Sequence, residues 1–225
     1  YGFRLPAAID NRPLKFEDWG LIDYSESFQR QLEAVQKIAQ GEMEERVVFC
    51  SHPPVVTLGR SSDETDVQGW SGEVVPINRG GRATYHGPSQ IVIYPLLNLT
   101  QSRSEFASKD IGAYLRFLEA WVIRALGELG ILAERKEAGA EDGDKSFTGV
   151  WVEDRKIASI GIAVKRWVSH HGCALNLRPD EKAFSGIQPC GFNRRVMTHV
   201  EAEAGRQVDY GEMKALLTRT YSVGR

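Results

Sequence analysis

The chain has 225 residues, of which 42% are hydrophobic and 26% are charged, and its formal net charge at pH 7 is −2. These values are typical of a globular protein, no apolar run approaches the roughly 18 residues of a membrane-spanning helix, and nothing at the start resembles a signal peptide. Basic residues occur in pairs such as Lys165-Arg166 rather than along a stripe, which argues against a nucleic-acid-binding protein.

The first predicted element is a helix over residues 25–40. Apolar residues recur there with helical periodicity, and Gly41 follows as a typical helix-ending residue. The expected apolar face consists of Phe28, Leu32, Val35 and Ala39. Strand-like apolar runs come next, over residues 47–51, 55–58, 74–78 and 90–94.

A second helix is predicted over residues 110–129, where a wide apolar stripe runs from Ile111 to Leu129 and ends at Gly130. A strand is expected at 131–135, and the charged, glycine-rich stretch 137–145 is expected to be a mobile surface loop. The last helix follows Asp209, with Glu212 as its capping-box partner.

Residues 147–177 predict a β-meander. Its strands cover 147–152, 156–164 and 167–177, with charged turns between them. Because strands and helices do not alternate regularly, we expect an α+β fold with largely antiparallel sheets and packed helices. The length suffices for one large domain or at most two small ones, and we expect a single catalytic domain over residues 1–225.

The most informative residue is Cys190, in the turn Pro189-Cys190-Gly191. A thiol becomes a useful nucleophile only as a thiolate, which needs a nearby cation or base. Lys156 lies in an apolar strand, where the pKa of a lysine falls readily, so that it can transfer protons near neutral pH. The turn also predicts free N–H groups for an oxyanion. The structural alternatives are a small turn residue at 190 and a solvated turn lysine at 156.

Glycines mark two further segments. Residues 79–90 contain glycines that permit close backbone approach to a ligand, although a simple hairpin explains them equally well. Gly161 and Gly172 would leave a groove beside the sheet for an extended ligand. His170 and His171 are adjacent on a strand, so they are expected to point to opposite faces, with at most one of them in the groove.

The three cysteines match no zinc pattern, and no metal site is expected. Cys50 and Cys173 lie in apolar strands and are expected to be inert buried thiols. Reduced cysteines are typical of the cytoplasm, where we expect this protein to be located.

Taken in order, four segments resemble the lipoyl(octanoyl) transferase family. They are Arg79-Gly80-Gly81 with Thr84 to Pro88, Gly149 to Val152 with Lys156 to Gly161, His171-Gly172 with Ala174 to Asn176, and Pro189-Cys190-Gly191. The resemblance extends from about Val47 to Val200. One departure is Ser89, which stands where the family usually has glycine.

The resemblance implies the catalytic fold of biotin and lipoate protein ligases. It implies transfer of an octanoyl group from octanoyl-acyl carrier protein to a lysine of lipoyl domains, in 2-oxoacid dehydrogenase complexes and in the glycine cleavage H protein. No cofactor is expected, because the thioester on the carrier's phosphopantetheine is already activated and the octanoyl group is held covalently on the enzyme. A monomer with no nucleic-acid or membrane partner is expected.

The resemblance also implies site residues. Cys190 would be the acyl-thioester nucleophile, and Lys156 would tune it. The implied substrate-binding residues are Arg79, Gly80, Gly81, Arg82, Ala83, Thr84, Tyr85, His86, Ser159, Ile160, Gly161, Gly172, Cys173 and Ala174. Because such carrier proteins are acidic, a positive patch is expected near the site, with five candidates: Arg60, Arg82, Arg155, Arg194 and Arg195.

Three alternatives remain open from the sequence. An ATP-dependent lipoate ligase would share the fold but would need no covalent cysteine. A non-catalytic acyl-chain-binding module would bind its ligand without turnover. An acyl-thioester hydrolase would release the acyl group to water, and only protection of the acyl-enzyme from water separates it from a transferase.

Overall fold

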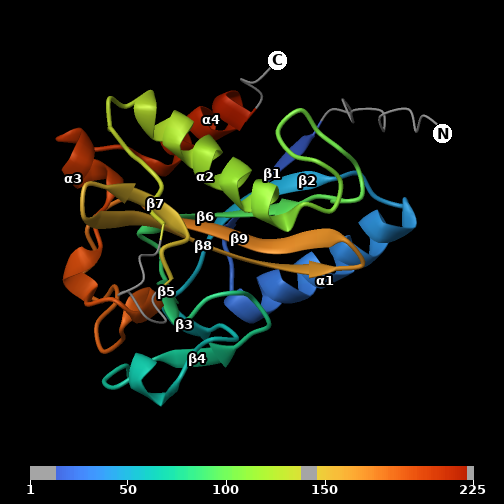
Figure 1. Cartoon of the computed structure of the whole chain (residues 1–225). Helices are drawn as coiled ribbons and strands as arrows, with labels where there is room; N and C mark the ends of the chain where they lie inside the picture. The colour runs from blue at the N-terminus through green and yellow to red at the C-terminus, as the bar shows by residue number, and fades with distance from the viewer. Residues whose placement is uncertain (1–13, 138–145, 222–225) are drawn as a thin grey trace.

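Two sheets form the framework of the computed structural model, which describes residues 14–137 and 146–221 (Figure 1). The large sheet has the order β1-β2-β6-β9-β8-β7, with β1 (Lys15–Leu21), β2 (Arg46–Ser51), β6 (Gln90–Leu96), β7 (Gly149–Val152), β8 (Arg155–Lys165) and β9 (Val168–Asn176). The small sheet has the order β4-β3-β5, with β3 (Val55–Leu58), β4 (Glu73–Pro76) and β5 (Thr84–His86). β1 and β2 are parallel, as are β3 and β4, and the other paired strands are antiparallel. The predicted α+β fold with largely antiparallel sheets is confirmed.

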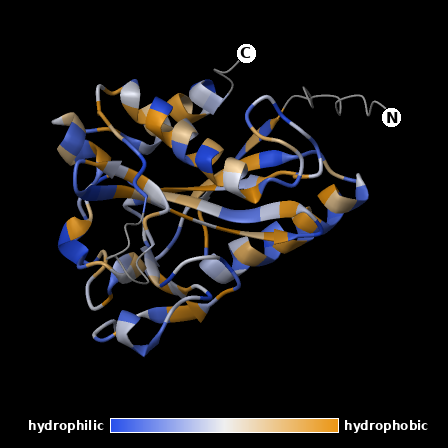
Figure 2. Ribbon diagram, in the orientation of Figure 1, coloured by the Kyte–Doolittle hydropathy of each residue, from blue (hydrophilic) through white to orange (hydrophobic). Residues whose placement is uncertain are grey.

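Helices cover both faces of the large sheet. α1 (Tyr24–Gln40) lies on one face, and α2 (Ile111–Gly127) and α4 (Tyr210–Tyr221) lie on the other (Figure 1). A short helix, α3 (Val200–Ala204), precedes α4 in the chain. Both α1 and α2 carry hydrophobic and hydrophilic residues along their length (Figure 2), as amphipathic helices do. The buried Trp121 of α2 donates a hydrogen bond from Nε1 to the carbonyl of Leu217 on α4, at 2.8 Å. The described part of the chain contains no helix long and apolar enough to cross a membrane.

The predicted end of α1 is confirmed, whereas α2 ends at Gly127, two residues before the predicted Leu129. Gly41 ends α1 with a left-handed φ of 76°, and the Asp110 carboxylate caps α2 by accepting from the N–H of Ala113 at 2.7 Å. Before α4, the Asp209 carboxylate accepts from the N–H of Glu212, but the Glu212 carboxylate pairs with an arginine, so only half of the predicted capping box forms.

The buried face of α1 is rotated from the predicted one. Val35 is buried as expected, but Phe28, Leu32 and Ala39 are half-buried, and the buried positions are Tyr24, Ser27, Gln31, Ala34, Val35 and Ile38. The polar Gln31 turns inward because its side-chain oxygen accepts the buried N–H of His171, at 2.8 Å. Tertiary hydrogen bonding therefore overrides the apolar pattern.

Three other local predictions are wrong. Residues 131–135 form no strand beyond an isolated bridge from Glu134 to Trp151, and Leu132 is 91% exposed. Ile111 is exposed at the first turn of α2 rather than buried. Residues 79–90 form no hairpin, because β5 pairs in the small sheet and β6 in the large one. The loop predicted at 137–145 lies, apart from Glu137, outside the described residues.

Candidate active site

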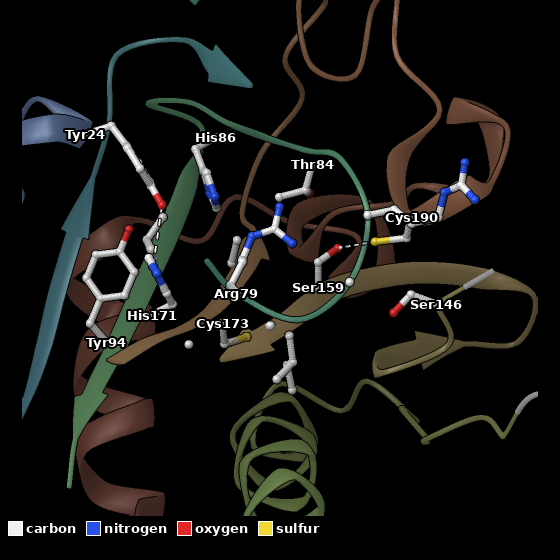
Figure 3. A pocket seen from close by; sticks show the side chains of 17 residues that line it. Tyr24, Arg79, Thr84, His86, Tyr94, Ser146, Ser159, His171, Cys173 and Cys190 are labelled. Atoms are coloured by element: carbon white, nitrogen blue, oxygen red, sulfur yellow. Dashed lines mark hydrogen bonds between the residues drawn. The ribbon is translucent and has the colours of Figure 1, made fainter. Parts of the chain in front are cut away.

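A pocket lies between the centre of the large sheet and the segment 79–86 (Figure 3). Small residues face each other in adjacent strands beneath it, with Ser159 of β8 opposite Ala174 of β9 and Gly161 opposite Gly172. Because these side chains are small or missing, the sheet leaves room for a ligand. Figure 3 shows Cys190 and Ser146 at one end of the pocket, hereafter the Cys190 end, and Tyr24, Tyr94 and His171 at the other, hereafter the His171 end.

The buried side chain of Arg79 lies across Gly161. A Cβ atom at position 161 would come within 2.9 Å of the Gly80 carbonyl oxygen and 3.2 Å of Arg79 Cδ, so the close approach requires glycine. The guanidinium donates to the hydroxyl of Thr57 at 2.8 Å and to the Gly80 carbonyl at 2.9 Å. Burial lowers the pKa of Arg79, but an arginine keeps its charge in proteins. The middle of the pocket therefore contains a positive charge that these hydrogen bonds hold in place.

Cys190 occupies a short 3₁₀ turn (Pro189–Gly191) and is 7% exposed. Its backbone is left-handed, with a φ of 56° and a ψ of 24°, which costs a non-glycine residue about 1–3 kcal/mol. Two backbone hydrogen bonds hold it there, from its N–H to Ala83 at 2.9 Å and from the N–H of Ser146 to its carbonyl at 3.0 Å. The thiol lies 3.8 Å from the hydroxyl of Ser159.

The prediction that this turn has free N–H groups is wrong. The N–H of Cys190 donates to Ala83, and that of Gly191 donates to Gln188 at 3.1 Å. The donors that line the pocket near the thiol are side chains instead. Ser159 supplies one hydroxyl, and Thr84 supplies another, which is buried and has no hydrogen-bond partner among the described residues.

Lys156 is fully buried on β8 and is not a solvated turn lysine. Its Nζ donates to the carbonyl of Ser146 at 2.7 Å and lies 5.3 Å from the ring centre of Trp151 and 5.8 Å from that of Phe192. Gly149 makes room for it, since a Cβ there would come within 2.8 Å of Lys156 Cε. Ser146 thus connects the two predicted catalytic residues: its carbonyl accepts from Lys156, and its N–H donates to the Cys190 backbone.

Most of the predicted substrate-binding residues line this pocket together with Cys190. They are Arg79, Gly81, Arg82, Thr84, His86, Ser159, Ile160, Gly161, Gly172, Cys173 and Ala174. Gly80 and Ala83 lie behind the lining and contribute backbone hydrogen bonds to Ile162 and Cys190.

Tyr85 points away from the pocket, because successive side chains of β5 alternate between faces. Its hydroxyl donates to the Asp180 carboxylate at 2.9 Å, and so does the hydroxyl of Ser89 at 2.9 Å. Ser89 does not line the pocket; it connects the turn before β6 to the segment that leads to Cys190.

Five lining residues were not predicted: Tyr24, Val92, Tyr94, Ser146 and His171. The expectation that His170 and His171 point to opposite faces is wrong. His171 has a φ of 57°, which interrupts the alternation of β9, and the two rings lie side by side with centres 4.9 Å apart. Of the two, only His171 lines the pocket, as expected from the prediction that at most one of them lies in the groove.

The His171 end is polar but uncharged. His52 lies behind it and shares hydrogen bonds with the Tyr94 hydroxyl at 2.8 Å and the Ile22 carbonyl at 2.7 Å. Burial lowers the pKa of His52 to about 4 and that of His171 to about 3, and it holds the pKa of His86 well below its usual range. The imidazoles are therefore neutral at pH 7.

Cys50 and Cys173 are buried, as predicted, and all three cysteines are free. Burial raises the pKa of Cys173 to about 12 and raises that of Cys50 as well. Both thiols are therefore protonated at neutral pH, although Cys173 lines the pocket.

Carboxylates neutralise part of the predicted positive patch. Arg82 pairs with Asp63 and Asp66, and Arg155 pairs with Glu203 at 2.9 Å, so these two arginines are neutralised. Arg194 and Arg195 are exposed just after the Cys190 turn, and Arg60 is exposed as well.

Known structures share this arrangement of sheets and helices. A lipoate protein ligase described with its E2 lipoyl domain from Thermoplasma acidophilum aligns with a TM-score of 0.62 at 17% identity, covering 93% of this chain and 82% of that one. A biotin protein ligase from Aquifex aeolicus aligns with a TM-score of 0.50 at 12% identity, covering 93% of this chain and 68% of that one. The fold is therefore that of the lipoate and biotin protein ligases.

Sequence comparison narrows the class. Residues 23–222 match the family model of the lipoyl protein ligase A/B catalytic domain, and the chain belongs to this family. The octanoyltransferase of Bdellovibrio bacteriovorus is 46% identical over 210 residues, which cover 92% of this chain and 96% of that protein. The octanoyltransferase of Syntrophotalea carbinolica is 41% identical over 202 residues, which cover 90% of each chain.

Proposed function

We propose that this protein transfers an octanoyl group to a lysine of lipoyl domains through a thioester on Cys190. The observation that carries the proposal is a strained thiol at one end of a covered pocket, 3.8 Å from the Ser159 hydroxyl and linked through the backbone of Ser146 to the buried Lys156, in a chain 46% identical to an octanoyltransferase. Family membership supports the lipoyl-domain acceptor. Octanoyl-acyl carrier protein is the proposed donor.

In the first half-reaction, the Cys190 thiolate attacks the thioester carbonyl of the donor. The thiol proton passes to Lys156, and the hydroxyls of Ser159 and Thr84 donate to the oxyanion. Collapse of the tetrahedral intermediate breaks the donor's C–S bond. The carrier thiolate leaves and takes a proton from the Lys156 ammonium, so that a thioester on Cys190 and a free carrier thiol remain.

In the second half-reaction, neutral Lys156 takes a proton from the ammonium of the acceptor lysine. The resulting amine attacks the thioester on Cys190, and the C–S bond breaks as the amide forms. The departing Cys190 sulfur takes the second amine proton, which restores the thiol, and Lys156 releases its proton to solvent, which restores the neutral amine. No ATP is needed, because the donor thioester supplies the activated acyl group. Two surface clefts adjoin the Cys190 end and share Gly81 and Ser146 with the pocket, which supports access for two successive substrates.

Charge and packing support the remaining parts of the proposal. The exposed Arg194 and Arg195 follow the Cys190 turn and suit an acidic carrier protein. A monomer is part of the proposal, and three free cysteines fit the reducing cytoplasm.

Intact-mass spectrometry after mixing with octanoyl-carrier protein tests the covalent step. One octanoyl group should be added, peptide mapping should locate it on Cys190, and hydroxylamine should remove it. Cys190→Ser should lose turnover, because a serine hydroxyl is barely ionised near pH 7. The matched control is Cys50→Ala, a buried thiol outside the pocket, which should still load. Transfer at the normal rate by Cys190→Ala would refute the covalent mechanism.

A second stage separates the alternatives. Addition of a lipoyl domain should discharge the octanoyl group onto a lysine, in an amide that resists hydroxylamine, without ATP. Consumption of ATP would indicate a ligase. Release of free octanoate in place of the amide would indicate a hydrolase. Stoichiometric binding without any adduct or turnover would indicate a binding module.

A further inference from the structure

The His171 end of the pocket contains two buried ring nitrogens without hydrogen-bond partners among residues 14–137 and 146–221. They are Nδ1 of His86 and Nε2 of His171. Both residues line the pocket, and they are 7% and 2% exposed. His86 lies between Tyr24 and Arg79 in Figure 3, and His171 lies against Tyr24.

Neighbouring side chains contact both imidazoles without pairing with these two nitrogens. The Tyr24 hydroxyl lies 3.5 Å from Nδ1 of His171, and the rings of Tyr24 and His86 are stacked with centres 5.7 Å apart. A buried polar atom without a partner costs about 1–3 kcal/mol, so such atoms usually meet a ligand or water. The two nitrogens therefore leave this end able to pair with a hydrogen-bonding group on the occupant, whereas beside the methyl group of an octanoyl chain they are left to water.

The strand register gives the length of the pocket. The thiol of Cys190 lies beside Ser159, which is opposite Ala174 in β9. His171 is three residues from Ala174 along the same strand, a distance of about 10 Å at roughly 3.3 Å per residue. An extended octanoyl chain spans about 9 Å from C1 to C8, given C–C bonds of about 1.5 Å. A chain attached to Cys190 thus places C8 next to the imidazoles.

We propose that the His171 end is a polar subsite for the terminal substituent of an eight-carbon acyl chain. It accepts a neutral hydrogen-bonding group on C8, such as a hydroxyl, and disfavours a further methyl or methylene group there. A hydroxyl suits it because each neutral imidazole nitrogen either donates or accepts, and a hydroxyl does both. This inference rests on the proposed function, because the length is measured from a thioester on Cys190.

Two acyl-carrier thioesters of equal size test the proposal. Nonanoyl and 8-hydroxyoctanoyl chains have the same number of heavy atoms and differ only in a terminal methyl or hydroxyl group. One hydrogen bond to a nitrogen that is otherwise unpaired should make loading of Cys190 by the hydroxy chain about tenfold more efficient, as kcat/KM. Equal loading by the two chains would overturn the proposal and would mean that this end of the pocket selects acyl chains by size alone. Octanoyl-carrier protein is run alongside, and failure of octanoyl itself to load would overturn the proposed function as well.

A pair of neighbouring histidines provides the matched variants. His171→Phe keeps an aromatic ring but removes the nitrogen, so the ratio of hydroxy to methyl chain should fall several-fold. His170→Phe changes the adjacent buried ring, which does not line the pocket, and should keep the wild-type ratio. His86→Phe is the second pocket variant. Wild-type ratios in both pocket variants would overturn the assignment, and because each ratio is internal to one protein, partial loss of folding does not change it.

Discussion

The amino group of Lys156 donates a hydrogen bond to one carbonyl oxygen and lies near two aromatic rings. We expect Lys156→Ala to slow octanoyl loading by about 100-fold or more, the usual effect of losing a general acid–base group. Lys156→Arg should not restore the rate, since arginine retains the charge but cannot release a proton. The measurement is single-turnover loading followed by mass spectrometry, with thermal unfolding to check the fold.

The control for this prediction lies on the same strand. Lys165 is exposed at the far end of β8, so Lys165→Ala should load at the wild-type rate. Recovery of the rate by Lys156→Arg would mean that only the charge matters and would remove the proton-transfer role.

The sequence predicts some residues of the site and not others, depending on whether a local motif surrounds them. Cys190 and Lys156 stand out in the sequence because the residues around them form recognisable motifs. Tyr24 and Tyr94 carry no such local signal, since tertiary packing alone brings them to the pocket. Which of His170 and His171 enters the pocket stayed open, because the positive φ of His171 cannot be inferred from strand periodicity.

At the scale of elements, the turn that carries Cys190 depends on the segment 63–69. The backbone carbonyl of Asp66 accepts from the N–H of Gln188 at 2.9 Å, and the N–H of Gln68 donates to Gly186 at 3.0 Å. The fully buried Asp66 carboxylate in turn accepts from Nε of Arg82 at 3.0 Å. Arg82 precedes Ala83, whose carbonyl holds the N–H of Cys190. One ion pair therefore supports both sides of the turn.

Replacement of that buried carboxylate should loosen the turn. We expect Asp66→Asn to lower the free energy of unfolding by about 2 kcal/mol, because hydrogen bonds to charged groups are among the stronger ones. It should also slow the loading of Cys190. Asp63→Asn is the matched control, since Asp63 contacts the same arginine from a half-exposed position, and its effect should be much smaller. Urea denaturation measures both variants, and equal losses would contradict this account.

Elements with local signals were the ones predicted correctly. The three long helices and the β8–β9 pair follow from periodicity and turn residues within one stretch of chain. β1 was missed because it pairs in parallel with β2 across an intervening helix, and β5 because it joins a different sheet from its neighbour β6. Such pairings depend on contacts that no local pattern encodes.

The whole molecule should lose stability in mild acid. Burial lowers the pKa of His52 and His170 to about 4 and that of His171 to about 3, from an ordinary value of 6.5. Between these limits the unfolded chain binds protons that the folded chain does not, so the free energy of unfolding falls as the pH is lowered. Each histidine contributes up to about 1.4 kcal/mol per pH unit.

Urea denaturation across this pH range tests the expectation, and His170→Phe should show a shallower dependence than the wild type. Constant stability from pH 6.5 down to 4, or stability that rises with acid, would contradict the buried neutral imidazoles. Carboxyl groups with a lowered pKa, such as Glu203 beside Arg155, act in the same direction only at lower pH.

The two ends of the pocket come from different parts of the chain, and this bears on how such proteins diverge. The thiol is supplied by the Cys190 turn, whereas α1, β6 and β9 supply Tyr24, Tyr94 and His171. A substitution in the turn therefore leaves the wall at the opposite end intact. Changes in the turn and changes in the wall can therefore act separately, one on the reactive group and the other on the chain that fits the pocket.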